Sequence, residues 1–324
     1  MIFLLLFVIA FAIFLKLSDS SFNLYFWNRV LRRSEDAHYR GKVVWIVGSS
    51  TGIGEEIALR LAQFAPSLIL SSRREELLQG VARKCRDVNP VCQVKVLPMD
   101  TTDFAAMPDK VKAADQVFGK KVDIVILNAG RTQRAEWTEV EPSVDMDCFK
   151  VNTLGPTQLT RCLLKQRGLH PTGDKHDNLQ FIVINSIAAL LPAVLSPSYA
   201  ASKAALMQYF RLLAVELGEK GVKVSIVFPS HVYAPNLQLT AFTAETGKDH
   251  GEILEAPRKA QMMPDRAAEL ISLAAVNEIH ECVISATAGP MLFTYVYGLS
   301  PGVIARLINR VGALRFRKMR GGHE

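Results

Sequence analysis

A tyrosine and a lysine in the second half of the chain have the spacing of an acid/base pair. Tyr199 and Lys203 lie four residues apart in a segment of helix-forming composition, so both side chains are expected on one face of a helix. An ammonium beside a phenol favours the phenolate and lowers the pKa of a tyrosine from its usual value of about 10. The same spacing occurs by chance on many helices, so the pair alone does not identify an enzyme.

A serine stands shortly before this pair. The apolar run from Phe181 to Ile184 has the composition of a buried strand, and Ser186 follows its end. Parallel sheets present side chains to their ligand crevice at that position. We therefore predict that the Ser186 hydroxyl hydrogen-bonds the oxygen of a carbonyl or alcohol.

A glycine-rich turn near residue 50 has the composition of a dinucleotide site. It follows an apolar run, residues 43–47, and leads into a helical pattern. Glycines let the backbone approach a pyrophosphate, which the first N–H groups of the next helix then bind. A strained loop without a ligand is the alternative. The predicted cofactor contacts here are Gly48, Ser50, Gly52, Ile53 and Gly54.

The end of the second predicted strand indicates which cofactor is bound. The run 67–71 is followed by Ser72, Arg73 and Arg74. No carboxylate stands where the ribose 2′-hydroxyl of NAD would be bound, and Arg73 is placed to form charge-assisted bonds with the 2′-phosphate of NADP. This favours NADP(H), with a solvated arginine at a helix start as the alternative.

Short apolar runs alternate with helix-length segments along most of the chain. Parallel strands need long crossovers, so this alternation predicts an α/β fold with a doubly wound parallel sheet in a single domain, residues 42–289. The predicted strands are 43–47, 67–71, 94–97, 122–127, 181–184, 222–228 and 282–285, and the first two predicted helices are 53–64 and 75–87.

The composition fits one globular domain with basic ends. The chain has 324 residues, of which 49% are hydrophobic, and a formal net charge of +7. Basic residues gather at 29–42 and 306–320, which favours an anionic membrane surface over nucleic acid, although a solvated surface explains the second group equally well. The five cysteines lack metal-type spacing, so we expect small core residues and no metal site.

The N-terminus predicts a membrane anchor over residues 1–17. Met1–Leu15 is an uninterrupted apolar run, short for a spanning helix and close in length to a signal-peptide core. Neither a charged start nor a cleavage site accompanies it, which favours an uncleaved anchor. Lys16 and the following arginines predict a catalytic domain facing the cytosol. Residues 18–41 are expected to form a basic and aromatic linker.

The C-terminal residues 290–324 predict a basic amphipathic extension. Ser300 suits a helix N-cap and Pro301 the first helical position. Such a helix would lie on a membrane, or pack on the domain or on the second subunit of a homodimer. The residues expected on its apolar face are Ile304, Leu307, Ile308, Val311 and Leu314.

The conjunction of these motifs, from about Lys42 to Ala286, resembles the short-chain dehydrogenase/reductase family. The family's Asn-Ala-Gly element matches Asn128-Ala129-Gly130, and Asp100 matches its adenine-contacting aspartate. Its glycine pattern matches Gly48, Gly52 and Gly54, and its catalytic residues match Asn152, Ser186, Tyr199 and Lys203. The resemblance therefore implies a Rossmann-type fold, with Asn128, Tyr199 and Lys203 also contacting the cofactor.

Within the family, the apolar N-terminus, the Ser-Arg-Arg segment and the long C-terminal extension most resemble the membrane-associated dehydrogenase/reductase member 7 and 11β-hydroxysteroid dehydrogenase-like group. That resemblance implies an NADP(H)-dependent oxidoreductase of the endoplasmic reticulum membrane, acting on steroids, retinoids or lipid-derived carbonyls. Tyr199 would exchange a proton with the substrate oxygen while the cofactor exchanges a hydride. Lys203 would hold the nicotinamide ribose, and Asn152 would support a water chain.

Three departures from the family pattern stand near the expected crevice. Val47 replaces a common threonine, Ser230 replaces the glycine of a Pro-Gly pair, and Ala234 replaces a threonine that often contacts the nicotinamide. The last two suggest an alternative, a membrane-tethered NADPH-binding scaffold or sensor without turnover.

Overall fold

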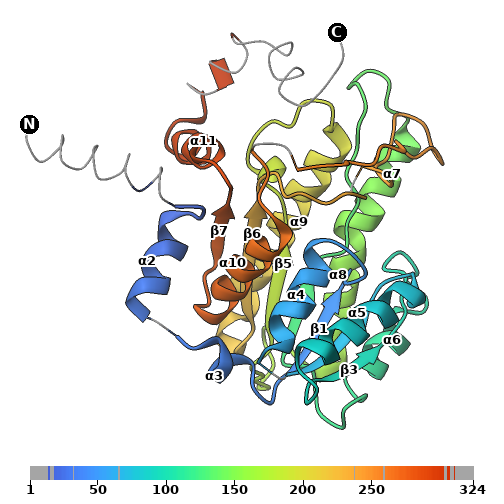
Figure 1. The fold of residues 1–324 in the computed structure, drawn as a ribbon, viewed down its shortest axis with the longest axis vertical. Coiled ribbons are helices and arrows are strands. Elements are labelled where there is room, and N and C mark those ends of the chain that lie inside the picture. Colours follow the sequence, from blue (N-terminus) through green and yellow to red (C-terminus); the bar gives the residue numbers. More distant parts are fainter. Residues whose placement is uncertain are drawn as a thin grey trace, which may run out of the picture.

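The structure is a computed structural model that describes residues 18–302, apart from residues 32, 65, 237, 258 and 259, together with residues 14, 305, 306 and 310. The described chain forms one parallel seven-stranded sheet with helices on both faces (Figure 1). The strand order is β3-β2-β1-β4-β5-β6-β7, so the chain changes direction across the sheet between β1 and β4. A doubly wound sheet opens its ligand crevice at this switch point. The predicted fold class is confirmed.

The strands begin and end close to the predicted apolar runs. They are β1 (Val43–Val47), β2 (Ser67–Ser71), β3 (Gln93–Val96), β4 (Ile124–Leu127), β5 (Gln180–Ile184), β6 (Lys223–Pro229) and β7 (Glu281–Ile284). The largest difference is at β4, which was expected to start at Val122. The Val122 N–H instead donates to the Asp115 carboxylate at 2.8 Å, so the ladder with β1 starts at Ile124.

Alternate residues of the central strands point into two hydrophobic cores on opposite faces of the sheet. In β1, Val44 and Ile46 pack in one core, while Val43, Trp45 and Val47 pack in the other. All five are buried, which explains why the parallel strands have continuous apolar sequences.

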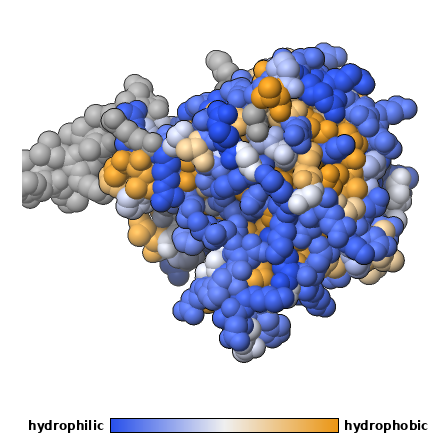
Figure 2. Space-filling view, turned by 90° about the horizontal axis from the view of Figure 1, so that it is seen from below, coloured by the Kyte–Doolittle hydropathy of each residue, from blue (hydrophilic) through white to orange (hydrophobic). Residues whose placement is uncertain are grey.

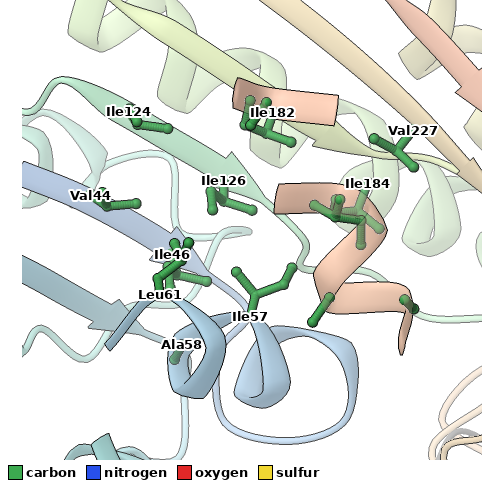
Figure 3. Packing of buried hydrophobic residues seen from close by; sticks show 14 of the residues in the cluster. Val44, Ile46, Ile57, Ala58, Leu61, Ile124, Ile126, Ile182, Ile184 and Val227 are labelled. Atoms are coloured by element: carbon green, nitrogen blue, oxygen red, sulfur yellow. The ribbon is translucent and has the colours of Figure 1, made fainter. Parts of the chain in front are cut away.

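Helices on both sides of the sheet close these cores. On the first face, Ile57 and Leu61 of α4 pack against isoleucines of β1, β4 and β5 (Figure 3). The helices that contribute most residues to this core are α4 (Ile53–Ala62), α5 (Glu75–Val88) and α10 (Pro264–Val276). Those that contribute most to the second core are α6 (Met107–Ala114), α8 (Gly155–Arg167) and α9 (Pro197–Leu217).

The cysteines behave as core residues. Cys85, Cys92, Cys148 and Cys282 are buried and Cys162 is partly buried, all as free thiols. Burial raises the pKa of the Cys85 thiol to about 12 and that of Cys92 to about 11, so neither is a reactive thiolate.

Residues 18–41, expected to be a linker, pack against the domain. The Ser21 N–H donates to the Val283 carbonyl of β7 at 2.8 Å. Two helices follow, α2 (Phe22–Leu31) and α3 (Glu35–Tyr39), and Tyr39 is fully buried. The folded body therefore begins before the first strand.

The C-terminal segment contains a helix that was not predicted, α11 (Ala288–Leu299), which ends just before Ser300. Pro301 and Gly302, at the start of the predicted helix, are also helical. The Tyr295 hydroxyl accepts a hydrogen bond from the Phe22 N–H at 2.7 Å, so α11 lies beside the start of α2 (Figure 1). The predicted apolar face, Ile304, Leu307, Ile308, Val311 and Leu314, lies outside the described residues.

The predicted anchor, residues 1–17, also lies outside the described residues, except for Phe14. Among the helices that the structure describes, none combines the length and the apolar character needed to cross a membrane.

Candidate active site

The glycine-rich turn between β1 and α4 is seated against the end of β4. A Cβ on Gly48, whose φ is +90°, would lie 2.5 Å from the backbone nitrogen of Ala129. A Cβ on Gly54 would lie 2.0 Å from the Gly48 carbonyl oxygen, which also accepts a hydrogen bond from Asn128 Nδ2 at 2.7 Å. Both positions require glycine, and the turn thus keeps a bare backbone at the crevice.

Helix α4 begins directly behind this turn. Gly52, with φ +61°, precedes Ile53 and has no side chain to cap the helix. The first N–H groups of α4 therefore remain available to an anionic ligand such as a pyrophosphate. Ala234, one of the departures from the family pattern, lies nearby, because a Cβ on Gly52 would be 3.7 Å from its side chain.

Two arginines stand beside the turn, shortly after the end of β2. Arg74 donates from Nη2 to the hydroxyl of the buried Ser50 at 3.3 Å. Arg73 lines a cavity of about 390 Å³ together with Asp100 and Lys110. The structure therefore places the predicted residues Ser50, Arg73 and Asp100 around one region. It adds Arg74, which was not among the predicted cofactor contacts.

Asn152 lies on a short π-helical turn, η1 (Lys150–Leu154), inserted between α7 (Pro142–Phe149) and α8. Such wide turns are frequent at functional sites, because they turn a side chain away from the regular helical face. The Asn152 side chain accepts from the Arg131 N–H at 2.8 Å and donates to the Arg131 carbonyl at 2.9 Å. It also donates to the Ser202 hydroxyl of α9 at 3.1 Å.

Lys203 projects from α9 toward the end of β5. Its ammonium donates to the Ile184 carbonyl at 2.9 Å, and the residue is 4% exposed. Burial lowers the pKa of Lys203 to about 8, so the group is still mostly protonated at pH 7. A Cβ on Gly130 would lie 3.0 Å from Asn152 Oδ1 and 3.5 Å from Lys203 Nζ, so the two side chains flank this glycine.

Ser186 caps a one-turn helix, η2 (Ile187–Ala189), just after β5. Its hydroxyl oxygen accepts from the Ala188 N–H at 3.1 Å, which leaves the hydroxyl hydrogen to donate. The neighbouring Asn185 accepts from the Ser186 N–H at 2.8 Å and donates to the Lys203 carbonyl at 3.1 Å. Ser186 is thus tied to α9.

Tyr199 lies in the first turn of α9 and is partly buried. Its ring packs against a small cluster formed by Val144, Cys148 and Phe242. Its carbonyl accepts from the Ser202 hydroxyl at 2.8 Å, and Ser202 is also the residue that binds Asn152. The four predicted catalytic residues therefore lie on segments that contact one another directly.

Arg131 was also not found from the sequence. Its guanidinium donates to the Thr240 carbonyl at 2.8 Å, pairs with Asp249, and lies 3.7 Å from the centre of the Phe242 ring. It thereby fastens the long segment between β6 and α10 to the chain beside Asn152. A lone arginine after Asn-Ala-Gly gives no sequence signal of these distant partners.

Comparison with known proteins identifies the family. A family model described as short chain dehydrogenase matches residues 42–243. The chain belongs to this family. It is 32% identical over 281 residues to dehydrogenase/reductase SDR family member 7 of Mus musculus, covering 86% of this chain and 80% of the mouse protein. It is 29% identical over 308 residues to member 7B of Bos taurus, covering 93% and 88%.

Solved structures share the fold. A short-chain dehydrogenase from Streptomyces avermitilis superposes with a TM-score of 0.65 at 25% identity, covering 82% of this chain and 96% of that one. An alcohol dehydrogenase from Thermococcus sibiricus, complexed with 5-hydroxy-NADP, superposes with a TM-score of 0.62 at 21% identity, covering 77% and 98%. The protein is thus an oxidoreductase of the short-chain dehydrogenase family, whose fold binds a nicotinamide dinucleotide.

Proposed function

We propose that this protein is an NADP(H)-dependent oxidoreductase that transfers hydride between the nicotinamide and a hydrophobic carbonyl or alcohol. The observation that carries the proposal is the meeting of Asn152 and Lys203 around Gly130, one helical turn from Tyr199. This meeting occurs at the carboxyl ends of the central strands, beside the glycine turn. Tyr199, the acid/base group, and the glycine turn, the dinucleotide site, would thus line the same crevice.

Each residue of the crevice has a separate role in the proposed reaction. The bound cofactor supplies or accepts the hydride. In the reducing direction, the Ser186 hydroxyl donates a hydrogen bond to the carbonyl oxygen, and Tyr199 gives that oxygen a proton as negative charge develops. Lys203, protonated at neutral pH, favours the phenolate that Tyr199 leaves behind. Asn152 holds the backbone of Arg131 in place beside Lys203.

The two arginines beside the turn support NADP(H) over NAD(H). Arg73 and Arg74 bring two guanidinium groups to the region where the adenosine 2′-phosphate would lie, and Arg74 is already oriented by Ser50. Asp100 also lines this region, but its carboxylate accepts from the Thr102 N–H and hydroxyl, both at 2.8 Å. The local charge therefore favours a phosphate.

We expect NADPH to support reduction of one or more members of a panel of hydrophobic ketones and aldehydes.

Arg73→Ala and Arg74→Ala should each weaken NADPH binding by about tenfold or more, since a hydrogen bond to a charged group contributes roughly 1.5–3 kcal/mol. NADH binding should change little. Arg83→Ala, an exposed arginine on α5, is the matched control. Equal losses for both cofactors would contradict NADP(H) selectivity, and tight NADPH binding without turnover would favour the scaffold alternative.

We also propose that α2 and α11 contact a membrane beside the apolar residues 1–15. Figure 2 shows hydrophobic side chains gathered at the side where Figure 1 places α2, besides a second hydrophobic area on the other half of the same face. The exposed hydrophobic residues on the two helices are Phe22, Phe26, Trp27, Val30, Leu31, Leu292, Phe293 and Leu299. Aromatic side chains are preferred at the membrane–water interface.

The full chain is expected to bind vesicles that contain anionic lipids, and deletion of residues 1–17 should weaken this binding without abolishing it. A second change, Phe26→Ser with Trp27→Ser in the deleted chain, should then abolish it. Co-sedimentation with vesicles measures both effects. If the chain that lacks only residues 1–17 stays entirely in the supernatant, the two helices have no membrane role.

A further inference from the structure

The first turn of α9, which carries Tyr199, is capped by a residue from a distant part of the chain. An α-helix leaves its first N–H groups without intrahelical acceptors. Pro197 at the first position has no N–H, and the Ala200 N–H is bound by the Ser196 carbonyl at 3.0 Å. Only the N–H groups of Ser198 and Tyr199 then need an acceptor. Gln133 Oε1 accepts from both, at 2.8 and 3.4 Å.

The residue that would ordinarily cap this helix is engaged elsewhere. Ser196 occupies the cap position, but its hydroxyl donates to the Gln133 carbonyl at 2.7 Å and accepts from Arg134 Nη1 at 3.1 Å. The preceding Leu195 has φ +63°, a left-handed conformation that a leucine rarely adopts. Its carbonyl accepts from the Ala135 N–H at 3.0 Å. The connection into α9 is therefore held in a strained shape by residues 133–135.

Gln133 is placed so that water cannot replace it. The residue is 0% exposed, as is Ser196, and Ser198 is 1% exposed. Its own Nε2 has no hydrogen-bond partner among the described residues, so the amide nitrogen contributes nothing to the cap. The side-chain oxygen is the functional atom, and its removal would leave two buried N–H groups without an acceptor.

The same short segment also contacts the other parts of the site. Residue 131 holds Asn152 through its backbone, and residue 133 forms a parallel bridge with Phe242, which packs on the Tyr199 cluster. A shift of the Gln133 side chain would therefore change the position of Tyr199. It would leave the glycine turn, which follows β1, in place.

We propose that Gln133 is a positioning residue for the reaction: its side-chain oxygen fixes the first turn of α9 and thereby the position of the Tyr199 hydroxyl. The inference rests on the proposed function, because it assigns Gln133 to the same acid/base step. Tyr199 is the third residue of α9, within the turn that frays first when a helix loses its cap. A displacement of about 1 Å at a reacting group can cost on the order of 100-fold in rate.

Two substitutions of nearly equal size separate the oxygen from the volume of the side chain. Gln133→Met removes the acceptor, whereas Gln133→Glu keeps a carboxyl oxygen of the same reach that can accept from both N–H groups. Gln180→Met is the matched control. Gln180 is also buried, and its amide donates to the Ala275 carbonyl at 2.8 Å, but it lies at the start of β5, away from α9's first turn.

The test measures hydrogen exchange of the first-turn amides of α9 in the full chain, NADPH affinity, and kcat with a carbonyl that the unmodified protein reduces. We expect Gln133→Met to lower kcat by about 10- to 100-fold with unchanged NADPH affinity, and to speed exchange at residues 198–199. Gln133→Glu should restore both properties. Gln180→Met should leave both near their original values.

The proposal is overturned if Gln133→Met retains slow exchange and normal kcat, or if Gln180→Met loses as much kcat and exchange protection as Gln133→Met. A failure of the proposed function looks different, because the unmodified protein would then reduce no carbonyl. The exchange measurement still decides the role of Gln133 in that case: faster exchange in Gln133→Met supports the cap, and unchanged exchange overturns it.

Discussion

Replacing Tyr199 by phenylalanine is expected to lower turnover by about 10²- to 10⁴-fold, the contribution of a well-placed general acid or base. The substitution removes one hydroxyl and keeps the ring. The packing against Val144, Cys148 and Phe242 should therefore survive. The Tyr199 backbone contacts with Gln133 and Ser202 are also retained. NADPH affinity and thermal stability should stay close to those of the unmodified protein.

The measurement is kcat with NADPH and a reducible carbonyl, together with NADPH affinity by fluorescence and the melting temperature. Tyr209→Phe is the matched control, because Tyr209 lies on the same helix, is 39% exposed, and faces Arg161 through its ring. It should show normal turnover. Undiminished turnover in Tyr199→Phe would remove Tyr199 from the mechanism and leave the fold with a different acid.

The sheet could be predicted because its central strands are buried on both faces. Trp45 and its neighbours in β1 alternate between two cores, yet every residue is apolar, so the strand is visible in the sequence as a continuous run. The element ends were less predictable. The start of β4 depends on Asp115, a side chain from the end of α6 that accepts the Val122 N–H.

The site could be predicted only where its residues belong to motifs of fixed spacing along the chain. The glycine turn, Asn128, and the Tyr199–Lys203 pair are recognisable because their spacing along the chain fixes their geometry. The side-chain hydrogen-bond partners of Arg131 and Gln133 lie far away in sequence, from Ser198 at a separation of 65 to Asp249 at 118. Nothing in the residue types nearby distinguishes a buried cap from an ordinary polar loop.

The packed segment before β1 was missed for a related reason. Residues 18–41 contain aromatic and basic residues, a composition equally compatible with a membrane-proximal linker. What places the segment in the fold is the hydrogen bond from Ser21 to β7 and the burial of Tyr39. The first depends on the edge strand β7 and the second on α10, where the Ser272 carbonyl accepts from the Tyr39 hydroxyl; both elements lie more than 200 residues later in the chain.

Replacing Gly54 by alanine is expected to weaken NADPH binding by at least about 100-fold, equivalent to roughly 2.7 kcal/mol. The added Cβ would stand 2.0 Å from the Gly48 carbonyl oxygen and 2.6 Å from Asn128 Nδ2, closer than real atoms approach. Neither neighbour is a flexible side-chain end. Gly48 is itself held by the Ala129 backbone, and Asn128 is held by its bond to the Gly48 carbonyl. The turn must therefore open, and overpacking of this kind costs about 1–3 kcal/mol of stability.

Gly80→Ala provides the matched control, and the contrast between the two glycines isolates the effect of the turn. Gly80 lies inside α5, where the nearest atom to an added Cβ is Arg83 Nη2 at 4.0 Å. Alanine there should stabilise the protein by up to about 1 kcal/mol through helix propensity, with NADPH affinity unchanged. Fluorescence titration and thermal melts of both variants test this. Normal NADPH affinity in Gly54→Ala would mean that the cofactor does not lie on this turn. The added Cβ crowds the Gly48 carbonyl and the Asn128 amide, which form the surface that the cofactor would contact.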